Sequence, residues 1–442
     1  MNYAYAFPPL DEKDLDNGLK VICISDKEQH GFVVALQLPV GRFSDPAGRE
    51  GVCEIMMGLL SKGTESFSSE EIAEKLEHAG ATFFSDVGEE HAVIGIRMLA
   101  SSLTELLPLF IEMIKGPIFP LEEFKRLRQE MVTGLLAETA DTSFLSTRHF
   151  YAELAPLGHP AGKFQTGRSL RNITLEDVKR FYDDYAAPAG CIAVLAGDWE
   201  RPMLSRIALE QFSLWKKRDP AKKAVVAPSL PRRPKTAVRL VHKPDLTQAS
   251  LAIGHASPGE TCAEKNALLL ANHILGAGNF SSRLMTRIRT ADGKTYGITS
   301  QLITEKEFGA FLITTSTQNS QLQGVLKSII EEYRRFCNEG VTADELEKAK
   351  QFAIGNMAFQ LEGIGNLVDK LLWLRFYGRP NSYIEKFGDI ISSIDVSAVN
   401  DAIRKYLSPE NLVIVAVGKK DEIKTQLETF GAVKLFNFRD KL

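Results

Sequence analysis

The sequence predicts an α+β protein of two homologous halves, each a mainly antiparallel sheet covered by helices. Two observations predict this class. Strand-like and helix-like segments come in separate runs rather than in strict alternation. Residue groups also recur at offsets of 219, 222 and 221: Asp26/Gln29 as Asp245/Gln248, 123–129 as 345–351, and Tyr185/Pro188/Gly197 as Tyr406/Pro409/Gly418. Because this period is too long for a solenoid, it indicates a duplicated domain.

The first half shows the order of elements. Strands are expected at 19–25, 32–40, 81–85, 92–98 and 191–196, and the first two are expected to form a hairpin. The segment that begins at Gly51 is expected to lie on a helix, and further helices are expected from about Ser68, Leu103 and Leu121. Ser68 and Glu71 fit a capping box, as do Thr342 and Glu345 in the second half.

The predicted domains are residues 1–219 and 236–442, joined by a linker at 220–235. Residues 216–235 contain four prolines among basic residues, a composition typical of an extended surface linker. A basic arm that binds nucleic acid is the alternative. No aromatic residues are interleaved there for stacking on bases, so the linker interpretation is favoured.

Composition gives no sign of nucleic acid or membrane as a partner. Apolar residues make up 44% and charged residues 25% of the chain, and the net charge is −3. No apolar run is long enough to span a bilayer, and the N-terminal segment lacks the features of a signal peptide. We therefore expect a cytoplasmic location for the chain as written, or a periplasmic one if a leader was trimmed. Five scattered cysteines without a C-x-x-C pair predict free thiols.

Residues 51–64 read GVCEIMMGLLSKGT. This segment resembles the zinc-binding motif of the insulinase/pitrilysin (inverzincin) peptidases, G-x-A-H-x-x-E-H-x-x-x-K-G-T. The frame matches, but Glu54, Met57 and Gly58 stand where the family has His, Glu and His. In such a motif two imidazoles hold zinc and the carboxylate takes a proton from bound water. A thioether cannot act as that base, and glycine offers no ligand.

The resemblance places the family's third ligand, a glutamate, at Gly134. Glu130 and Glu138 each lie four residues away, about one helical turn. We therefore expect no metal on this chain, with Glu54, Met57, Gly58 and Gly134 as degenerate metal positions. A standalone hydrolase that uses Glu54 and Glu130 is a less favoured alternative.

Residues 280–297 read FSSRLMTRIRTADGKTYG. They resemble the family's S-R-L-x-x-x-x-R-x-x-x-G-x-x-Y segment, with Arg289 and Tyr296 as the matching Arg and Tyr. The resemblance implies that these two bind the substrate backbone and stabilise the oxyanion. A guanidinium and a phenol suit that task. Arg283 is expected to brace the helix–strand corner, and Phe84 and Ser85 fall on the family's substrate-pairing edge strand.

Three other patterns are set aside. Gly293-Lys294-Thr295 resembles the end of a phosphate-binding loop, but that motif requires Gly at the position of Ile288. Residues 89–91 have ligand-type side chains but are expected in a solvated turn. His273 lies in an apolar helical segment and is expected to be a core histidine.

The resemblance implies a LuxS/MPP-like metallohydrolase fold whose two halves close like a clam shell. It also implies a role. We hypothesise a subunit, inactive alone, of a heterodimeric zinc metallopeptidase. A homologous partner would carry H-x-x-E-H and the zinc, while Arg289 and Tyr296 come from this chain. The alternative is a peptide-binding or structural scaffold of the same fold with no catalytic role.

Overall fold

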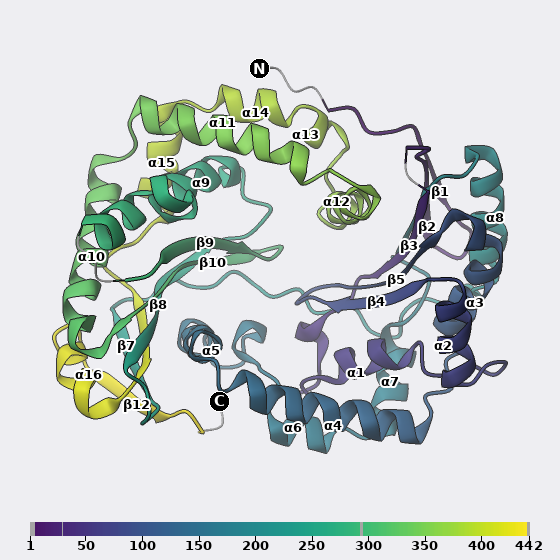
Figure 1. The fold of residues 1–442 in the computed structure, drawn as a ribbon, viewed down its shortest axis with the longest axis horizontal. Coiled ribbons are helices and arrows are strands. Elements are labelled where there is room, and N and C mark those ends of the chain that lie inside the picture. The colour runs from purple at the N-terminus through teal and green to yellow at the C-terminus, as the bar shows by residue number, and fades with distance from the viewer. Residues whose placement is uncertain (1–4, 29, 292–294, 440–442) are drawn as a thin grey trace. The chain divides into compact units, whose positions relative to one another are not determined.

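The computed structural model describes residues 5–28, 30–291 and 295–439, so Gln29 of the repeat and Gly293 and Lys294 of the motifs lie outside it. The described chain forms two compact units (Figure 1). Unit 1 comprises residues 1–133, 165–226 and 356–387, and unit 2 comprises residues 134–164, 227–355 and 388–442.

Each unit contains a six-stranded sheet. In unit 1 the strand order is β1 (Leu10–Asp14), β2 (Lys20–Ser25), β6 (Ile192–Gly197), β3 (Gly31–Leu38), β5 (Ala92–Leu99) and β4 (Thr82–Val87). In unit 2 it is β12 (Val433–Asn437), β7 (Ala237–His242), β11 (Val413–Gly418), β8 (Gln248–Pro258), β10 (Phe308–Gln318) and β9 (Ile298–Thr304).

The two sheets repeat one another in five of six strands. β2–β6 and β7–β11 pair in parallel, and the three following pairs of each sheet are antiparallel. The sixth strands differ, because β1 is antiparallel to β2 whereas β12 is parallel to β7. This confirms the predicted α+β class and the duplication.

The predicted hairpin of the first two strands is wrong. β6 lies between β2 and β3, so that Val194 pairs with Ile22 on one side and with Ala35 on the other. The four inner residues of β2 are all buried. Such a continuous buried run is typical of a central strand covered on both faces.

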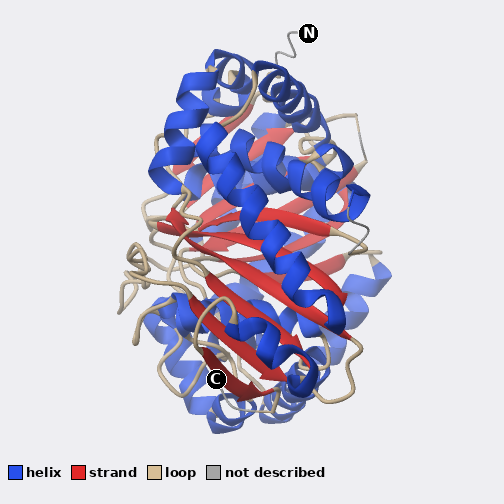
Figure 2. Cartoon of the chain, turned by 90° about the vertical axis from the view of Figure 1, so that its left-hand side faces the viewer, coloured by secondary structure: helices blue, strands red, loops and turns tan. Residues whose placement is uncertain are grey.

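Helices cover both sheets, and Figure 2 shows those of unit 2 lying over its strands. The helices of the first half are α1 (Val52–Leu59), α2 (Ser69–His78), α3 (Leu103–Lys115), α4 (Leu121–Glu138), α5 (Thr142–Leu154), α6 (Gly167–Asn172), α7 (Leu175–Tyr185) and α8 (Arg201–Ser213). Those of the second half are α9 (Lys265–Asn272), α10 (Leu322–Glu339), α11 (Ala343–Phe359), α12 (Ile364–Phe376), α13 (Ser382–Glu385), α14 (Phe387–Ser393), α15 (Val396–Tyr406) and α16 (Lys420–Glu428). Both predicted capping boxes form, at Ser68–Glu71 and at Thr342–Glu345.

The two halves of the sequence exchange one helical segment each. α12, from the second half, packs on β3 and β6 of unit 1 (Figure 1). Its residues Leu367, Val368 and Leu371 are at most 4% exposed in that core. α5, from the first half, packs on β8 and β11 of unit 2. Each sheet is therefore built from one half of the sequence, while its cover includes a helix from the other half.

The proline-rich segment is irregular but not wholly exposed. Ala227 and Leu230 are buried. The Val225 N–H donates to Ser44 Oγ (3.0 Å). All five cysteines have free thiols, as predicted. Within the described ranges no helix combines the length and the apolarity needed to cross a lipid bilayer.

Candidate functional site

Helix α1 carries the degenerate motif, and a buried aspartate fixes its start. Gly51 precedes the helix with φ +106°, a left-handed conformation that favours glycine. The two oxygens of Asp45 accept from the N–H groups of Gly51 (2.6 Å) and Cys53 (2.9 Å). Burial raises the pKa of Asp45 to about 7, although these two hydrogen bonds act to lower it.

The two positions after Glu54 in the motif frame face packed protein. The Met57 side chain is fully buried. At Gly58, a Cβ atom would lie 2.8 Å from Leu127 Cδ2 of α4. Any side chain at position 58 therefore requires Leu127 to move. One carboxylate, one buried thioether and one glycine are not a donor set that fits a zinc ion.

Glu54 is engaged by protein groups. Gln165 Nε2 donates to Glu54 Oε2 at 2.6 Å, and Arg42 Nε lies 3.6 Å from the same oxygen. Arg42 also lies 3.5 Å from Glu89 Oε1. Burial raises the pKa of Glu89, and the Arg42 charge opposes this rise. The guanidinium thus stands between two carboxylates beside the motif helix.

The predicted solvated turn at residues 89–91 is a turn but is not solvated. Glu90 is 4% exposed, and the His91 ring lies 4.4 Å from that of Phe376. The cause is α12, which the sequence order gave no reason to expect over this end of the sheet.

The third ligand position lies on α4. Gly134 is exposed, and nothing lies within 4 Å of a Cβ built there. Glu130 pairs with Arg126 of its own helix, with Nη1 and Oε1 2.9 Å apart. In the part of the chain that the structure describes, no group of three or more His, Cys, Asp or Glu side chains is placed to hold a metal ion.

Arg289 and Tyr296 of unit 2 have surroundings that differ from those of the motif residues on α1. Arg289 lies on a π-helical segment, η6 (Met285–Ala291), with its guanidinium over the Phe280 ring at 4.7 Å. No carboxylate of a described residue pairs with it. The Tyr296 side chain is 80% exposed just before β9. Its neighbour Thr295 is buried and bonds to Thr315 Oγ1 (2.8 Å) and to the Ser316 carbonyl (2.7 Å). Tyr296 is therefore open to a ligand, while Arg289 is half-buried.

Arg283, which was expected to brace the helix–strand corner, instead ties this segment to the residues between α10 and α11 and to α11 itself. Its Nε and Nη2 donate to the two oxygens of Glu345 at 2.6 and 2.7 Å, and Nη2 also donates to the Gly340 carbonyl. Hydrogen bonds from Arg283 lower the pKa of Glu345 to about 2. The same carboxylate caps α11, so one residue joins the motif segment to the start of that helix.

Two π-helical segments, η6 and η4 (His273–Ala277), were not predicted from the sequence. Such segments are rare and frequent at functional sites. His273 is half-buried rather than in the core, and its ring stacks on that of Phe352 at 4.3 Å. Within η4, Gly276 is the residue that could have indicated a close contact, because a Cβ atom at this position would lie 2.4 Å from Ser300 Oγ.

The strand with Phe84 and Ser85 is an edge strand. β4 pairs only with β5 among the described strands. Ser85 is exposed, whereas Phe84 is half-buried over Gly95 and lies under the Arg97 guanidinium at 4.4 Å. The free edge offers backbone groups for an added strand.

The fold has two duplicated α+β units, and the segment on α1 keeps the spacing of a zinc-peptidase motif. These are the features of a metallopeptidase homologue. Residues 20–143 match the model of the insulinase peptidases (peptidase family M16), and residues 172–352 match the peptidase M16 inactive domain. The two models of this family together match most of the chain, which therefore belongs to peptidase family M16.

Similar proteins cover nearly the whole chain. A Helicobacter pylori "non-peptidase homolog YmxG" is 23% identical over 401 residues, covering 89% of this chain and 90% of its own. The H. pylori "zinc protease PqqE" is 22% identical, covering 97% and 94%. A solved M16 inactive domain from Pseudomonas fluorescens is 26% identical with a TM-score of 0.85, covering 93% and 98%. The Escherichia coli periplasmic protease PqqL shares the fold, with 17% identity, a TM-score of 0.78 and coverage of 93% and 45%.

Proposed function

We propose that this chain is the non-catalytic subunit of a two-chain M16 metallopeptidase. The partner is a homologous chain that carries H-x-x-E-H and the zinc. This chain contributes Arg289 and Tyr296 to the partner's active site, where they bind the peptide backbone and stabilise the oxyanion of the reaction. It holds no zinc itself.

A contrast between the two sites carries the proposal. At the motif, Glu54 is bonded to Gln165, Met57 is buried and Gly58 is crowded by Leu127. At the second segment, Tyr296 is 80% exposed and Arg289 lies over an aromatic ring, with no carboxylate of a described residue paired to it. Donors in such surroundings can stabilise charge on a bound substrate.

The edge strand β4 supports a role in peptide binding. An extended peptide that adds to this edge gains backbone hydrogen bonds without a catalytic centre. Ser85 is exposed there, while Phe84 anchors the strand to the sheet. In this proposal, β4 holds peptide that this chain does not cut.

The test compares the isolated chain with a mixture. The isolated chain is expected to hold no stoichiometric zinc and to leave a quenched-fluorescent peptide library uncut. Mixing it with an M16 chain that carries H-x-x-E-H should give chelator-sensitive cleavage above that of the partner alone, and the two should co-elute. Near-stoichiometric zinc together with cleavage by the isolated chain would contradict the proposal. The same holds if the partner's peptidase activity is equal with and without this chain.

A scaffold without a catalytic role is the second candidate, and the name "non-peptidase homolog" of one relative favours it. The two candidate functions predict different effects of substitutions at Arg289 and Tyr296. A scaffold should assemble and function with Arg289→Ala or Tyr296→Phe, whereas a contributing subunit should assemble but lose activity.

A further inference from the structure

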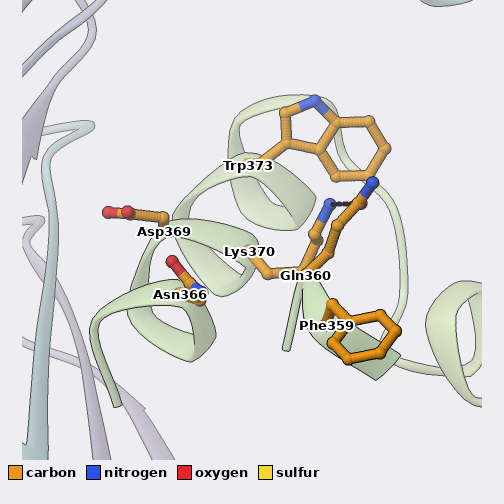
Figure 3. Close-up of a pocket in the computed structure, with 6 residues that line it drawn as sticks. All are labelled: Phe359, Gln360, Asn366, Asp369, Lys370 and Trp373. Carbon is orange, nitrogen blue, oxygen red and sulfur yellow. Dashed lines mark hydrogen bonds between the residues drawn. The ribbon is translucent and has the colours of Figure 1, made fainter. Parts of the chain in front are cut away.

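A cavity of about 500 Å³ lies in unit 1 where α11 ends and α12 begins. Six side chains line it: Phe359, Gln360, Asn366, Asp369, Lys370 and Trp373. Figure 3 shows that these divide into two sides, with Asp369 and Asn366 on one and the other four on the opposite side. None of them belongs to the motif of α1 or to the Arg289 segment.

Lys370 is a half-buried ammonium whose described neighbours are neutral. Its Nζ donates to Gln360 Oε1 at a long 3.4 Å and lies 5.3 Å from the centre of the Trp373 ring. No carboxylate in the described ranges lies within 4.0 Å of it. Burial lowers the pKa of Lys370. A partly desolvated cation without a counter-ion favours an anionic ligand, because the anion restores the lost solvation.

Figure 3 shows the Asp369 carboxylate pointing away from Lys370, so this neighbour in sequence does not supply the counter-ion. Asp369 lies instead within the electrostatic reach of Arg97 and Asp86. Asn366 donates to the Glu362 carbonyl at 2.8 Å, which leaves its amide oxygen as an acceptor. This side of the cavity therefore offers the Asn366 amide oxygen as an acceptor for an N–H group of a ligand.

Apolar contact comes from the two aromatic residues. The Phe359 side chain is 70% exposed, so its ring is open to contact with a ligand. Trp373 presents its ring beside the ammonium. An aromatic or aliphatic side chain placed between them would cover both rings.

We propose that this cavity binds the carboxyl-terminal end of a peptide. Lys370 and the Gln360 amide face the terminal carboxylate, Asn366 accepts from a backbone N–H group, and Phe359 and Trp373 contact the last side chain. A cavity with one cation, an amide acceptor and an apolar wall matches that set of groups. The chemistry is shared by a free amino acid, so the test must separate the two sources.

The test measures binding of N-acetyl-Ala-Ala-Phe as the free acid and as the carboxyl-terminal amide, by isothermal titration with the full chain. The acid is expected to bind saturably, and the amide at least about tenfold more weakly because it cannot pair with the ammonium. Equal affinity of the two forms, or no saturable binding of the acid at millimolar concentration, would overturn the proposal. Free phenylalanine that binds as tightly as the peptide acid would overturn its peptide part.

Two variants assign the effect to Lys370. Lys370→Met keeps the aliphatic stem and should reduce the affinity for the acid to that for the amide. Lys179→Met, at an exposed position on α7, is the matched control and should change nothing. If Lys370→Met kept the preference for the acid, the assignment would be wrong. Thermal melting checks that each variant folds, and the comparison of acid with amide on the unaltered chain needs no variant.

This inference does not rest on the proposed function. The titration uses this chain alone, whereas the proposed function is tested on a complex with a partner. Loss of peptidase activity in a reconstituted complex and loss of binding to the peptide acid are thus separate results.

Discussion

At the scale of single residues, Leu127 fills the space beside Gly58, the position that matches a ligand in the family motif. A Cβ there would lie 2.8 Å from the end of Leu127, so a larger side chain forces that leucine from its place. A histidine at this position must displace the end of the Leu127 side chain of α4.

We expect Gly58→His to destabilise the fold by about 1–3 kcal/mol, the usual cost of overpacking. Adding Leu127→Ala should recover part of that loss, even though Leu127→Ala alone leaves a gap. Urea unfolding of the two single variants and the double variant measures the coupling.

Gly134→Ala is the control for this prediction, since nothing lies within 4 Å of a Cβ at this helical position. It should stabilise the chain by about 0.5–1 kcal/mol through helix propensity. Additive effects of Gly58→His and Leu127→Ala would show that the two residues do not compete for space.

At the scale of elements, α5 is tied to unit 2 by a buried ion cluster. Glu153 of α5 is 6% exposed and pairs with Arg239, Arg233 and Lys434. These cations lie on or before strands of the second half of the sequence. A carboxylate with this many partners fixes the helix on its sheet.

Glu153→Ala should therefore cost about 3–5 kcal/mol, because it leaves Arg239 buried without its partner. Glu12→Ala is the comparison, since Glu12 of β1 pairs with Arg375 of α12 but is more exposed, and it should cost about 1 kcal/mol. Chemical denaturation gives both values. Similar costs for the two would mean that the cluster on α5 does not anchor the helix.

The Arg283–Glu345 pair predicts a dependence on pH. The pKa of Glu345 is lowered to about 2 in the fold from its ordinary 4.5, so the pair stabilises the folded state above pH 4.5. That stabilisation is lost as the pH falls from about 4.5 towards 2. The difference in melting temperature between the unaltered chain and Arg283→Met should be constant from pH 7 to 5 and shrink below.

A difference in melting temperature that stays the same down to pH 3 would show that Arg283 acts through packing on Phe336 rather than through charge. The guanidinium lies 5.0 Å from that ring, so this outcome has a structural basis. Glu71 caps α2 at the surface, away from Arg283, and a substitution at Glu71 is the control.

Local signals predicted the elements well, and long-range pairing limited the rest. The capping boxes at Ser68 and Thr342 were predictable because cap and partner are three residues apart. The strand that pairs with β2 could not be predicted in this way. It is β6, which follows about 170 residues later, and its parallel pairing is not signalled by the residues near β2. The packing of α5 and α12 on the sheets of the opposite halves could not be predicted for the same reason.

At the scale of the whole molecule, the repeat and the motif frames were enough to predict the fold and the family. Both are patterns of sequence spacing that survive when chemistry changes at individual positions. The surroundings of the candidate sites were not predictable in this way. The contact of Leu127 with Gly58 joins residues that are distant in sequence. The side chains around Lys370 come from residues 359–373, and their place in a cavity depends on how that segment folds.

The central claim is that Arg289 and Tyr296 act in a partner's active site. Removing one donor to an oxyanion commonly lowers kcat by about 10²–10³. In a complex reconstituted with an H-x-x-E-H partner, Arg289→Ala and Tyr296→Phe should each reduce kcat on this order while assembly is unchanged. Arg287→Ala, at an exposed position on the same π-helical segment, is the control and should leave kcat within about twofold.

The most direct measurement is kcat of the reconstituted complex with Tyr296→Phe, since this change removes one hydroxyl from an exposed side chain. The account predicts a loss of kcat on the order of a hundredfold, with zinc content and subunit association as in the unaltered complex. An unchanged kcat in a complex that assembles normally would contradict it and leave this chain as a scaffold.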